Sequence, residues 1–262
     1  MPRHAYTIRD LYFGHGQPLF AGLNLDIPQG LLTAIVGPNG SGKSTLLNIM
    51  TGQLKPQSGT VHLFGESTTG MSPRKMARNA ALMPQFHEFS FPFTVRETVF
   101  MGRHPHIPRF AAPRASDFEQ VEQAMAAMNI AQFALRRVTE LSGGERQRTM
   151  LARTLAQDTP VLLLDEPTAN QDISHSMRTL RTMRTLVREK GNTVVSVLHD
   201  LNHAAAFADH IVFLRQGSVH AAGPVSETLT TQNVHTVFDV DCQVRRDVFS
   251  ESLAVFFRPE SS

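Results

Sequence analysis

The sequence is poor in cysteine: Cys242 is its only one, so no disulfide can form within one chain. The sequence therefore requires no oxidising compartment. We interpret the lone thiol as a small, half-buried hydrophobic residue, because free cysteines usually pack in this way.

Long apolar runs are absent as well. No uninterrupted stretch approaches the roughly 20 apolar residues that span a bilayer, and residues 1–16 contain no continuous apolar core of the signal-peptide type. We therefore expect a cytosolic chain that reaches a membrane only by docking.

Charge of one sign is also scarce. The formal net charge is +2 over 262 residues, and Lys and Arg are not gathered into one block. Charge alone therefore does not indicate a nucleic-acid partner. Hydrophobic residues make up 41% of the chain, which is enough for a core, and no internal repeat is visible. The length suits one large domain, or one domain with an inserted lobe.

Short apolar runs predict buried strands. The runs "LLTAIV" (31–36), "VLLL" (161–164) and "TVVSVL" (193–198) are partly β-branched and do not alternate cleanly. This pattern is typical of strands in a sheet that helices cover on both faces. Polar or glycine-rich residues follow each run, so the fold class is α/β, with functional loops at the carboxyl ends of the strands.

Alternating segments predict antiparallel strands. Residues 7–13 and 23–28 alternate well enough to predict an antiparallel subsheet, and residues 210–223 predict two strands joined around Gln216-Gly217, which also favour such a subsheet.

Helical patterns occupy the middle of the chain. Residues 116–134 and 143–157 read as helices, the first with Ser116 as its N-cap. We interpret residues from about 85 to 157 as a mainly helical lobe inserted into the core of a single domain, 1–262. Residues from about 225 to 262 form a C-terminal extension, for which we predict a short helix and one or two strands.

The stretch "GPNGSGKST" (37–45) fits the phosphate-loop pattern G-x-x-x-x-G-K-[ST] in full. A buried strand is predicted before it and a helix from about Lys43 after it, which is the context that the pattern requires. Lys43 is expected to supply positive charge to the β- and γ-phosphates, and Ser44 to ligate Mg²⁺. The predicted nucleotide-binding residues here are Gly37, Asn39, Gly40, Ser41, Gly42, Lys43, Ser44 and Thr45.

The run "VLLLDEP" places two carboxylates at the end of a predicted strand. Asp165 can hold Mg²⁺ through water, and Glu166 can polarise the attacking water as a general base. A charged pair before a proline turn is the structural alternative, but the phosphate loop in the same chain favours the catalytic interpretation.

A second glycine pair lies in "LSGGERQR" (141–148), far along the chain from the phosphate loop. One interpretation of its charged residues is a basic nucleic-acid patch. The stretch is too short for that, contains an acidic residue and has no aromatic side chain, so we disfavour this reading.

In order, "GPNGSGKST", "MPQF", "LSGGERQR", "VLLLDEPT" and "VLHDL" resemble the motifs of ATP-binding cassette (ABC) transporter nucleotide-binding subunits, from about Thr7 to His220. The five residues "LSGGE" are similar to the signature of that family. The resemblance implies a P-loop NTPase fold, with an ABC ATPase core, an antiparallel β subdomain and an inserted α-helical subdomain. It also implies ATP hydrolysis coupled to transport, with ATP and Mg²⁺ bound.

The resemblance further implies a head-to-tail dimer with a second copy of the chain. ATP would lie between the phosphate loop of one subunit and Ser142, Gly143 and Gly144 of the other. A second anion-binding helix start near Glu145 is consistent with a chain that holds half of a site. Closure of the dimer would then depend on ATP.

Other site residues follow from the resemblance, position by position. Gln85 in "MPQF" matches the glutamine that reaches Mg²⁺ and the attacking water, and His199 in "VLHDL" matches the switch histidine at the γ-phosphate. Phe13 is the expected adenine-stacking aromatic, with Tyr12 as the alternative. Asp172 matches the aspartate of the interface loop.

The residue patterns and the resemblance together give two expected functional groups in addition to the nucleotide-binding residues. The catalytic residues are Glu166, His199 and Gln85, and the metal ligands are Ser44, Gln85 and Asp165. The chain departs from the family at Gln171, where Leu is frequent, which bears on local packing.

Two histidine pairs also have the spacing of metal ligands. His199 and His203 lie four apart on a predicted helix, but Asp200 stands where the H-E-x-x-H pattern needs Glu. We interpret His203 as an ordinary polar residue, and place His104 and His106 in a surface loop near the partner-docking region.

The segment "FTVRETVFMGRHPHIPRF" (93–110) resembles importer subunits that energise uptake of iron–siderophore complexes, haem and cobalamin. Subunits for zinc, manganese or molybdate import are similar and remain an alternative. Another is a soluble ABC ATPase of iron–sulfur-cluster assembly. A DNA-repair cassette is disfavoured, because the chain has no long coiled coil and too few cysteines for a zinc module.

An importer subunit of this kind implies a separate polytopic membrane permease as partner, docked by the region after Gln85, and indirectly a substrate-binding protein. No nucleic-acid partner is expected. The expected location is peripheral, at the cytoplasmic face of the cell membrane.

Overall fold

The computed structural model describes residues 3–85 and 91–258, and the fold is given for these residues. Its centre is a six-stranded sheet with the order β10-β9-β3-β8-β7-β6. Neighbouring strands are parallel except β10, which runs antiparallel to β9. The strands are β3 (Leu32–Val36), β6 (Ala80–Met83), β7 (Val161–Asp165), β8 (Thr193–Val197), β9 (His210–Arg215) and β10 (Ser218–Pro224).

Strands β3, β7 and β8 are buried along their whole length, because both faces of the sheet are covered. The α/β class and these three strands are therefore confirmed. The hairpin of residues 210–223 is present too. It extends one edge of the six-stranded sheet instead of an antiparallel subsheet, because β9 pairs in parallel with β3.

A second sheet has four strands, is antiparallel throughout and has the order β2-β1-β4-β5. Its first two strands confirm the pairing predicted for residues 7–13 and 23–28, with Ile8 opposite Leu25. The strands are β1 (His4–His15), β2 (Gln17–Pro28), β4 (Ser58–Leu63) and β5 (Glu66–Ser67), and helix α1 (Lys43–Met50) shares their core.

Helices connect and cover these sheets. Helix α2 (Pro73–Asn79) precedes β6, and α6 (Ile173–Lys190) and α7 (Leu201–Phe207) follow β7 and β8. Between β6 and β7 lie α3 (Val95–Phe100), α4 (Ala115–Ala127) and α5 (Gly143–Ala156), with 3-10 turns at Met101–Arg103, Ala131–Phe133 and Val138–Glu140. The helix predicted at 143–157 is confirmed. The helix predicted at 116–134 is present but shorter, because it ends at Ala127 and Asn129 takes a positive φ of 52°. The division into an inserted lobe at about 85–157 stays a prediction.

The start of α4 differs from the prediction. Ser116 is not the N-cap, because the helix begins at Ala115 and Arg114 takes the cap position. The backbone N–H of Arg114 donates to Asp117 Oδ2 at 2.9 Å, and the buried Arg103 donates through Nε to Asp117 Oδ1 at 3.0 Å. The Asp117 side chain thus satisfies the backbone N–H of the N-cap residue, and its ion pair with Arg103, outside the helix, holds that carboxylate.

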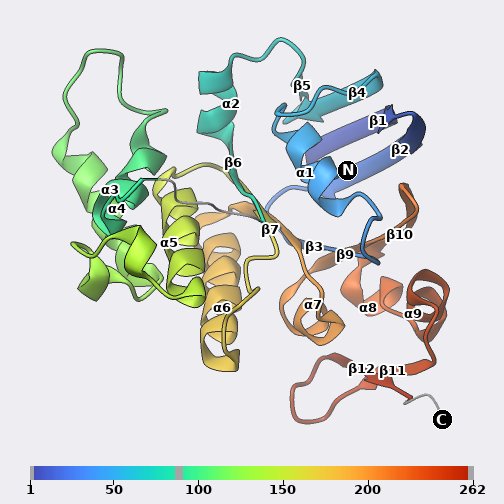
Figure 1. The fold of residues 1–262 in the computed structure, drawn as a ribbon. Helices are drawn as coiled ribbons and strands as arrows, with labels where there is room; N and C mark the ends of the chain where they lie inside the picture. The colour runs from blue at the N-terminus through green and yellow to red at the C-terminus, as the bar shows by residue number, and fades with distance from the viewer. Residues whose placement is uncertain (1–2, 86–90, 259–262) are drawn as a thin grey trace.

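Two hydrophobic clusters lie on the two faces of the six-stranded sheet. Ile35 and Val195 belong to the cluster that includes α1 and the antiparallel sheet. Their neighbours Ala34 and Val194 belong to the cluster that includes α5 and α6, because successive side chains of a strand point to opposite faces. Figure 1 shows α3, α4 and α5 gathered on the left and the antiparallel sheet with α1 at the upper right.

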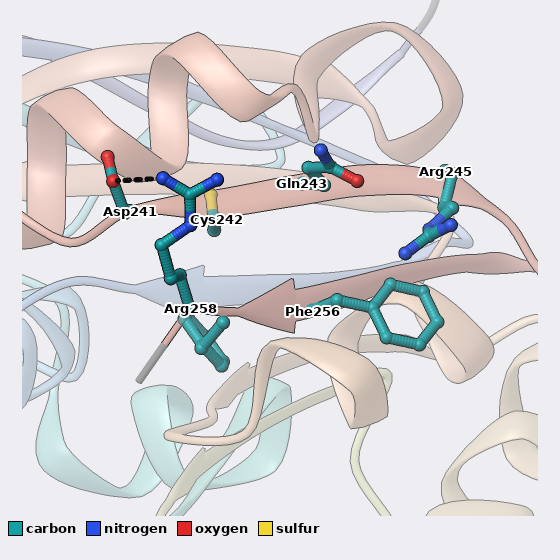
Figure 2. Close-up of a pocket in the computed structure, with 7 residues that line it drawn as sticks. Asp241, Cys242, Gln243, Arg245, Phe256 and Arg258 are labelled. Atoms are coloured by element: carbon teal, nitrogen blue, oxygen red, sulfur yellow. Dashed lines mark ion pairs between the residues drawn. The ribbon is translucent and has the colours of Figure 1, made fainter. Parts of the chain in front are cut away.

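The chain continues past β10 with α8 (Val225–Thr228), α9 (Thr231–Phe238) and a two-stranded ribbon of β11 (Cys242–Arg246) and β12 (Leu253–Phe257). Figure 2 shows the outer face of this ribbon, where the Arg245 guanidinium lies 4.5 Å from the Phe256 ring centroid and Arg258 pairs with Asp241 at 3.6 Å. Cys242 is partly buried against the main core, which confirms its packing role.

The short apolar runs of the sequence predict no segment that crosses a membrane. In the part of the chain that the structure describes, no helix combines the length and the apolar character that a crossing requires.

The turn between β9 and β10 supports the site, because Gly217 N–H donates to Ser41 O at 3.2 Å. Gly217 has a φ of +72°, and a Cβ there would collide with the carbonyl oxygen of Leu19 in β2. We expect Gly217→Ala to lower the free energy of unfolding by about 3 kcal/mol or more, measured by urea denaturation.

Gly52 offers the matched control. Its φ is +70°, but no atom of the residues that the structure describes lies within 4 Å of an added Cβ. Gly52→Ala should cost only about 1 kcal/mol, the penalty of the left-handed conformation itself. Equal losses in the two variants would show that the contact between the turn and β2 is unimportant.

Candidate functional site

The phosphate loop follows β3 at the carboxyl edge of the six-stranded sheet, and α1 begins at its lysine. Lys43 is buried, and its Nζ donates to the carbonyl oxygens of Gly37 and Pro38, each at 2.8 Å. Burial lowers the pKa of Lys43, while the nearby Glu166 and Asp165 carboxylates oppose that shift. The ammonium is therefore held at the loop, as a phosphate partner needs.

The shape of the loop depends on close packing. A Cβ at Gly42 would lie 2.7 Å from the Phe20 ring, so a side chain there would displace β2 or the helix start. Ser41 Oγ is buried and has no hydrogen-bond partner among the described residues, which leaves it available to an anion. The other predicted residues of the loop, Asn39 and Gly40, are exposed at its tip.

Asp165 is the last residue of β7 and meets the first turn of α1. Its carboxylate is buried and hydrogen-bonds to the Ser44 side chain. Burial raises the pKa of Asp165, and the Ser44 bond opposes that effect. Asp165 Oδ1 has no partner within the described residues. A buried carboxylate oxygen without a partner beside a hydroxyl fits the all-oxygen ligand set that Mg²⁺ prefers.

Glu166, the next residue, joins two further elements. Its Oε1 accepts a hydrogen bond from Gln85 Nε2 at 2.6 Å, and His199 Nε2 lies 2.6 Å from the same oxygen. Gln85 follows β6 and His199 follows β8, so the carboxyl ends of neighbouring parallel strands bring the three side chains together. The structure thus assembles the three residues that the sequence predicts as catalytic, although their roles remain predictions.

His199 does not lie on the helix that follows it. Helix α7 begins at Leu201, and Asp200 is its N-cap, with Oδ1 accepting from the backbone N–H groups of Asn202 and His203 at 2.7 and 3.3 Å. The prediction that His199 and His203 share a helix is therefore wrong, because the Asp200 side chain caps α7 and the helix begins after it. This cap leaves His199 free to point to Glu166.

His106 also departs from its predicted environment. It is half-buried, and its Nε2 lies 2.7 Å from the Gln157 carbonyl oxygen at the end of α5, whereas His104 is exposed. The loop is held against α5, so only His104 has the surface position expected for both.

One contact at the site involves a residue that sequence reasoning missed. Gln147, on α5, is buried and donates through Nε2 to the backbone oxygen of Glu166 at 3.0 Å. The signal was weak: a buried glutamine on a helix face otherwise occupied by residues such as Leu151 and Ala152.

The second glycine turn forms the beginning of α5. Ser142 is its N-cap in a capping box, in which Ser142 Oγ accepts from Glu145 N at 3.3 Å and Glu145 Oε2 accepts from Ser142 N at 2.7 Å. No hydrogen bond or ion pair within the described ranges joins residues 142–144 to the loop 37–45. The structure therefore does not unite the two predicted anion sites within one chain.

Asp172 is the N-cap of α6. Its Oδ1 accepts from the backbone N–H of His175 at 2.8 Å and from Ser174 Oγ at 3.0 Å, and the His175 ring also contacts it. The His175 backbone bond is the main reason that the pKa of Asp172 falls to about 2. Asp172 is therefore ionised and exposed at the start of the helix.

Gln171 fits its place through polar contacts. Its Nε2 donates to Pro167 O at 3.0 Å, and its Oε1 accepts from Thr179 Oγ1 at 3.1 Å, so the amide fixes the loop to α6.

The two candidates for adenine stacking lie in β1. Phe13 is partly buried against the cluster around α1, and Tyr12 is 43% exposed. Which of the two stacks on adenine stays a prediction.

Comparisons with known proteins place the chain among proteins of one family. The family model described as ABC transporter matches residues 20–169. The chain is 44% identical over 245 residues to the cobalamin import ATP-binding protein of Halobacterium salinarum, covering 94% of this chain and 61% of that protein. It is 41% identical to the ferric enterobactin transport ATP-binding protein of Escherichia coli (strain K12), covering 90% and 88%.

Among solved structures, a metal-chelate type ABC transporter in an inward-facing conformation matches with a TM-score of 0.83 and 30% identity, covering 98% of each chain. The chain spans only 61% of the length of the cobalamin import relative, so that protein contains sequence with no counterpart here.

The buried lysine allows a direct test of the phosphate loop. Lys43→Ala removes a charged donor at the phosphates, so we expect ATP affinity, measured by isothermal titration, to fall by about 10- to 100-fold. Lys190→Ala, at the exposed end of α6, is the control and should bind ATP like the wild type. Unchanged affinity in folded Lys43→Ala would remove this loop from the binding site.

Proposed function

Because this chain belongs to the ABC transporter family, we propose that it is the ATP-binding and ATP-hydrolysing subunit of an importer, acting with a separate membrane permease. The observation that carries the proposal is Glu166, whose carboxylate is held by Gln85 and His199 beside the phosphate loop. This is the arrangement of a general base that two neighbouring residues orient.

In the proposed complex, the phosphate loop with Lys43 and the start of α1 binds the phosphates of ATP. An aromatic residue at the end of β1, Phe13, stacks on adenine. Ser44, Asp165 and Gln85 would hold Mg²⁺, which neutralises charge on the phosphates when bound. The buried Asp165 Oδ1, which has no hydrogen-bond partner in ranges 3–85 and 91–258, supports this assignment.

Hydrolysis in this proposal rests on Glu166. It accepts a proton from the attacking water, and the water oxygen forms the new bond to the γ-phosphorus as the bond to ADP breaks. Gln85 and His199 keep the carboxylate oriented from two sides, and His199, with a half-exposed side chain, can also reach the γ-phosphate.

We further infer that two copies pack head to tail, with Ser142, Gly143, Gly144 and Asp172 facing the nucleotide held by the partner. Helices α1 and α5 pack into different hydrophobic clusters on opposite faces of the sheet. Each offers a helix start to an anion, so two anion sites in one chain make sense if each is completed by a second copy.

The proposed cargo is an iron chelate, haem or cobalamin, in keeping with relatives named for cobalamin and ferric enterobactin. The cassette would sit at the cytoplasmic face of the membrane, with a substrate-binding protein as an indirect partner. The proposed docking segment follows Gln85; residues 86–90 lie outside the described residues. Beyond them, Phe91 and Phe93 are 66% and 42% exposed, with ring centroids 6.0 Å apart, and suit contact with a permease.

Glu166→Gln keeps the size of the side chain but cannot accept the proton. We expect ATP hydrolysis to fall by at least about 100-fold while ATP still binds. Tagged Glu166→Gln, loaded with ATP and Mg²⁺ in its native cells and extracted in mild detergent, should bring down a polytopic permease that mass spectrometry identifies.

Paired phenylalanine variants sharpen this experiment. Replacing Phe91 and Phe93 by Ser in the same background should abolish recovery of the permease. Phe249→Ser should leave it intact, because Phe249 is 98% exposed on the turn between β11 and β12. Recovery of a soluble scaffold without a membrane protein would contradict the importer function and favour cluster assembly.

A further inference from the structure

Glu166 has a backbone conformation that needs support. Its φ is +51°, in the left-handed region that residues other than glycine rarely adopt. Such a conformation persists only where the surroundings hold it in place. This backbone conformation matters, because it determines where the carboxylate of the proposed general base points.

From the described part of the chain, the backbone oxygen of Glu166 accepts two hydrogen bonds. One comes from Ala169 N–H at 3.1 Å, within the same turn. The other comes from Gln147 Nε2 at 3.0 Å, and it is the contact that ties this turn to another element. Gln85 and His199 hold only the carboxylate, so Gln147 fixes the opposite end of the same residue.

Gln147 lies on α5, the helix that begins at Ser142. It is only 6% exposed, so its amide is shielded from water and its bond to Glu166 is not easily replaced. The helix that starts at the glycine turn is thereby bonded to the backbone of the general base in the same chain.

A second contact strengthens this connection. A Cβ at Gly144 would lie 3.2 Å from the backbone oxygen of Asn170, so the first turn of α5 packs tightly on the segment that follows Glu166. Helix α5 therefore touches residues 166–170 at two points one helical turn apart. A shift of the helix is passed to the Glu166 turn through both.

We propose that Gln147 is a positioning residue for Glu166, which makes hydrolysis in one subunit depend on the placement of that subunit's own α5. This inference rests on the proposed function, in which the start of α5 contacts the ATP held by the partner. Occupancy of the partner's site then sets the position of Glu166 in this chain. The two nucleotide sites of a dimer are coupled through the contacts of α5 with residues 166–170, and the Gln147 amide is the contact that holds the Glu166 backbone itself.

Gln147 does not touch substrate or the reacting atoms, so its loss should act on turnover and not on binding. Gln147→Met keeps the length and volume of the side chain and removes the donor. We expect kcat for ATP to fall by about 10- to 100-fold, because a displacement of the base by about 1 Å has effects of this size. The KM for ATP should stay within about two-fold of the wild-type value, because the phosphate loop is unaltered.

A double-variant cycle separates positioning from a general loss of structure. If Gln147 acts through Glu166, adding Gln147→Met to Glu166→Gln should change the residual rate by less than about two-fold. A residue that supported only the stability of the helix would lower the rate in both backgrounds alike.

Gln157 provides the matched control. It lies at the other end of α5 and donates through Nε2 to the backbone oxygens of Ala77 and Ala80 at 2.6 and 3.3 Å. Gln157→Met thus removes side-chain amide bonds between the end of α5 and the core, away from Glu166. Its kcat should remain within about three-fold of the wild type, because these bonds touch no catalytic group.

The proposal is overturned if Gln147→Met retains kcat within about two-fold, falls no further than Gln157→Met, or raises KM in proportion. If Gln147→Met does not fold, Gln147→Asn replaces it, because its shorter side chain places the amide too far from the Glu166 backbone oxygen. The same fall in kcat with an unchanged KM is expected. A wild-type chain without ATPase activity would overturn the proposed function and this inference together, whereas an active wild type with an unaffected Gln147→Met overturns only the inference.

Discussion

The arrangement of the site depends on one set of contacts at the carboxyl edge of the parallel sheet. There, Gln85 and His199 both contact the same carboxylate oxygen of Glu166. The parallel order of β6, β7 and β8 makes this possible, because it brings the ends of three strands to the same edge. The fully buried strands keep that edge rigid, and the loops carry the polar groups. Lys43 and Asp165 are buried beside these contacts, so one positive and one negative side chain lie where phosphate would bind.

The two faces of the same sheet keep the two predicted anion sites of one chain apart. Helix α1 packs with the antiparallel sheet on one face, and α5 packs with the other helices on the opposite face. In the proposed dimer, each nucleotide is bound by α1 of one copy and α5 of the other. In that dimer, Gln147 connects α5, which contacts the nucleotide bound by the partner, to Glu166, the proposed general base for the nucleotide bound by its own chain.

Much of this arrangement could be predicted from the sequence, because apolar runs and phosphate-loop spacing depend on local residues. The strands at 31–36, 161–164 and 193–198 follow from burial on both faces. The errors have non-local or competing causes. At the start of α4, Asp117 accepts from the Arg114 backbone while Arg103, outside that helix, holds the same carboxylate. His199 is excluded from α7 by the Asp200 cap. Gln147 was missed because helical periodicity marks it as buried without showing which backbone oxygen its amide meets.

The central claim, a nucleotide site shared by two copies, is tested most directly by the mass of the protein in solution. Glu166→Gln should be a monomer without nucleotide and should double its mass when ATP and Mg²⁺ are added, as light scattering coupled to gel filtration would record. Gly143→Asp in the same background should still bind ATP but remain a monomer, because a negative charge at the start of α5 repels the partner's phosphates. A monomer under all conditions, or a dimer that Gly143→Asp leaves intact, would contradict the shared site.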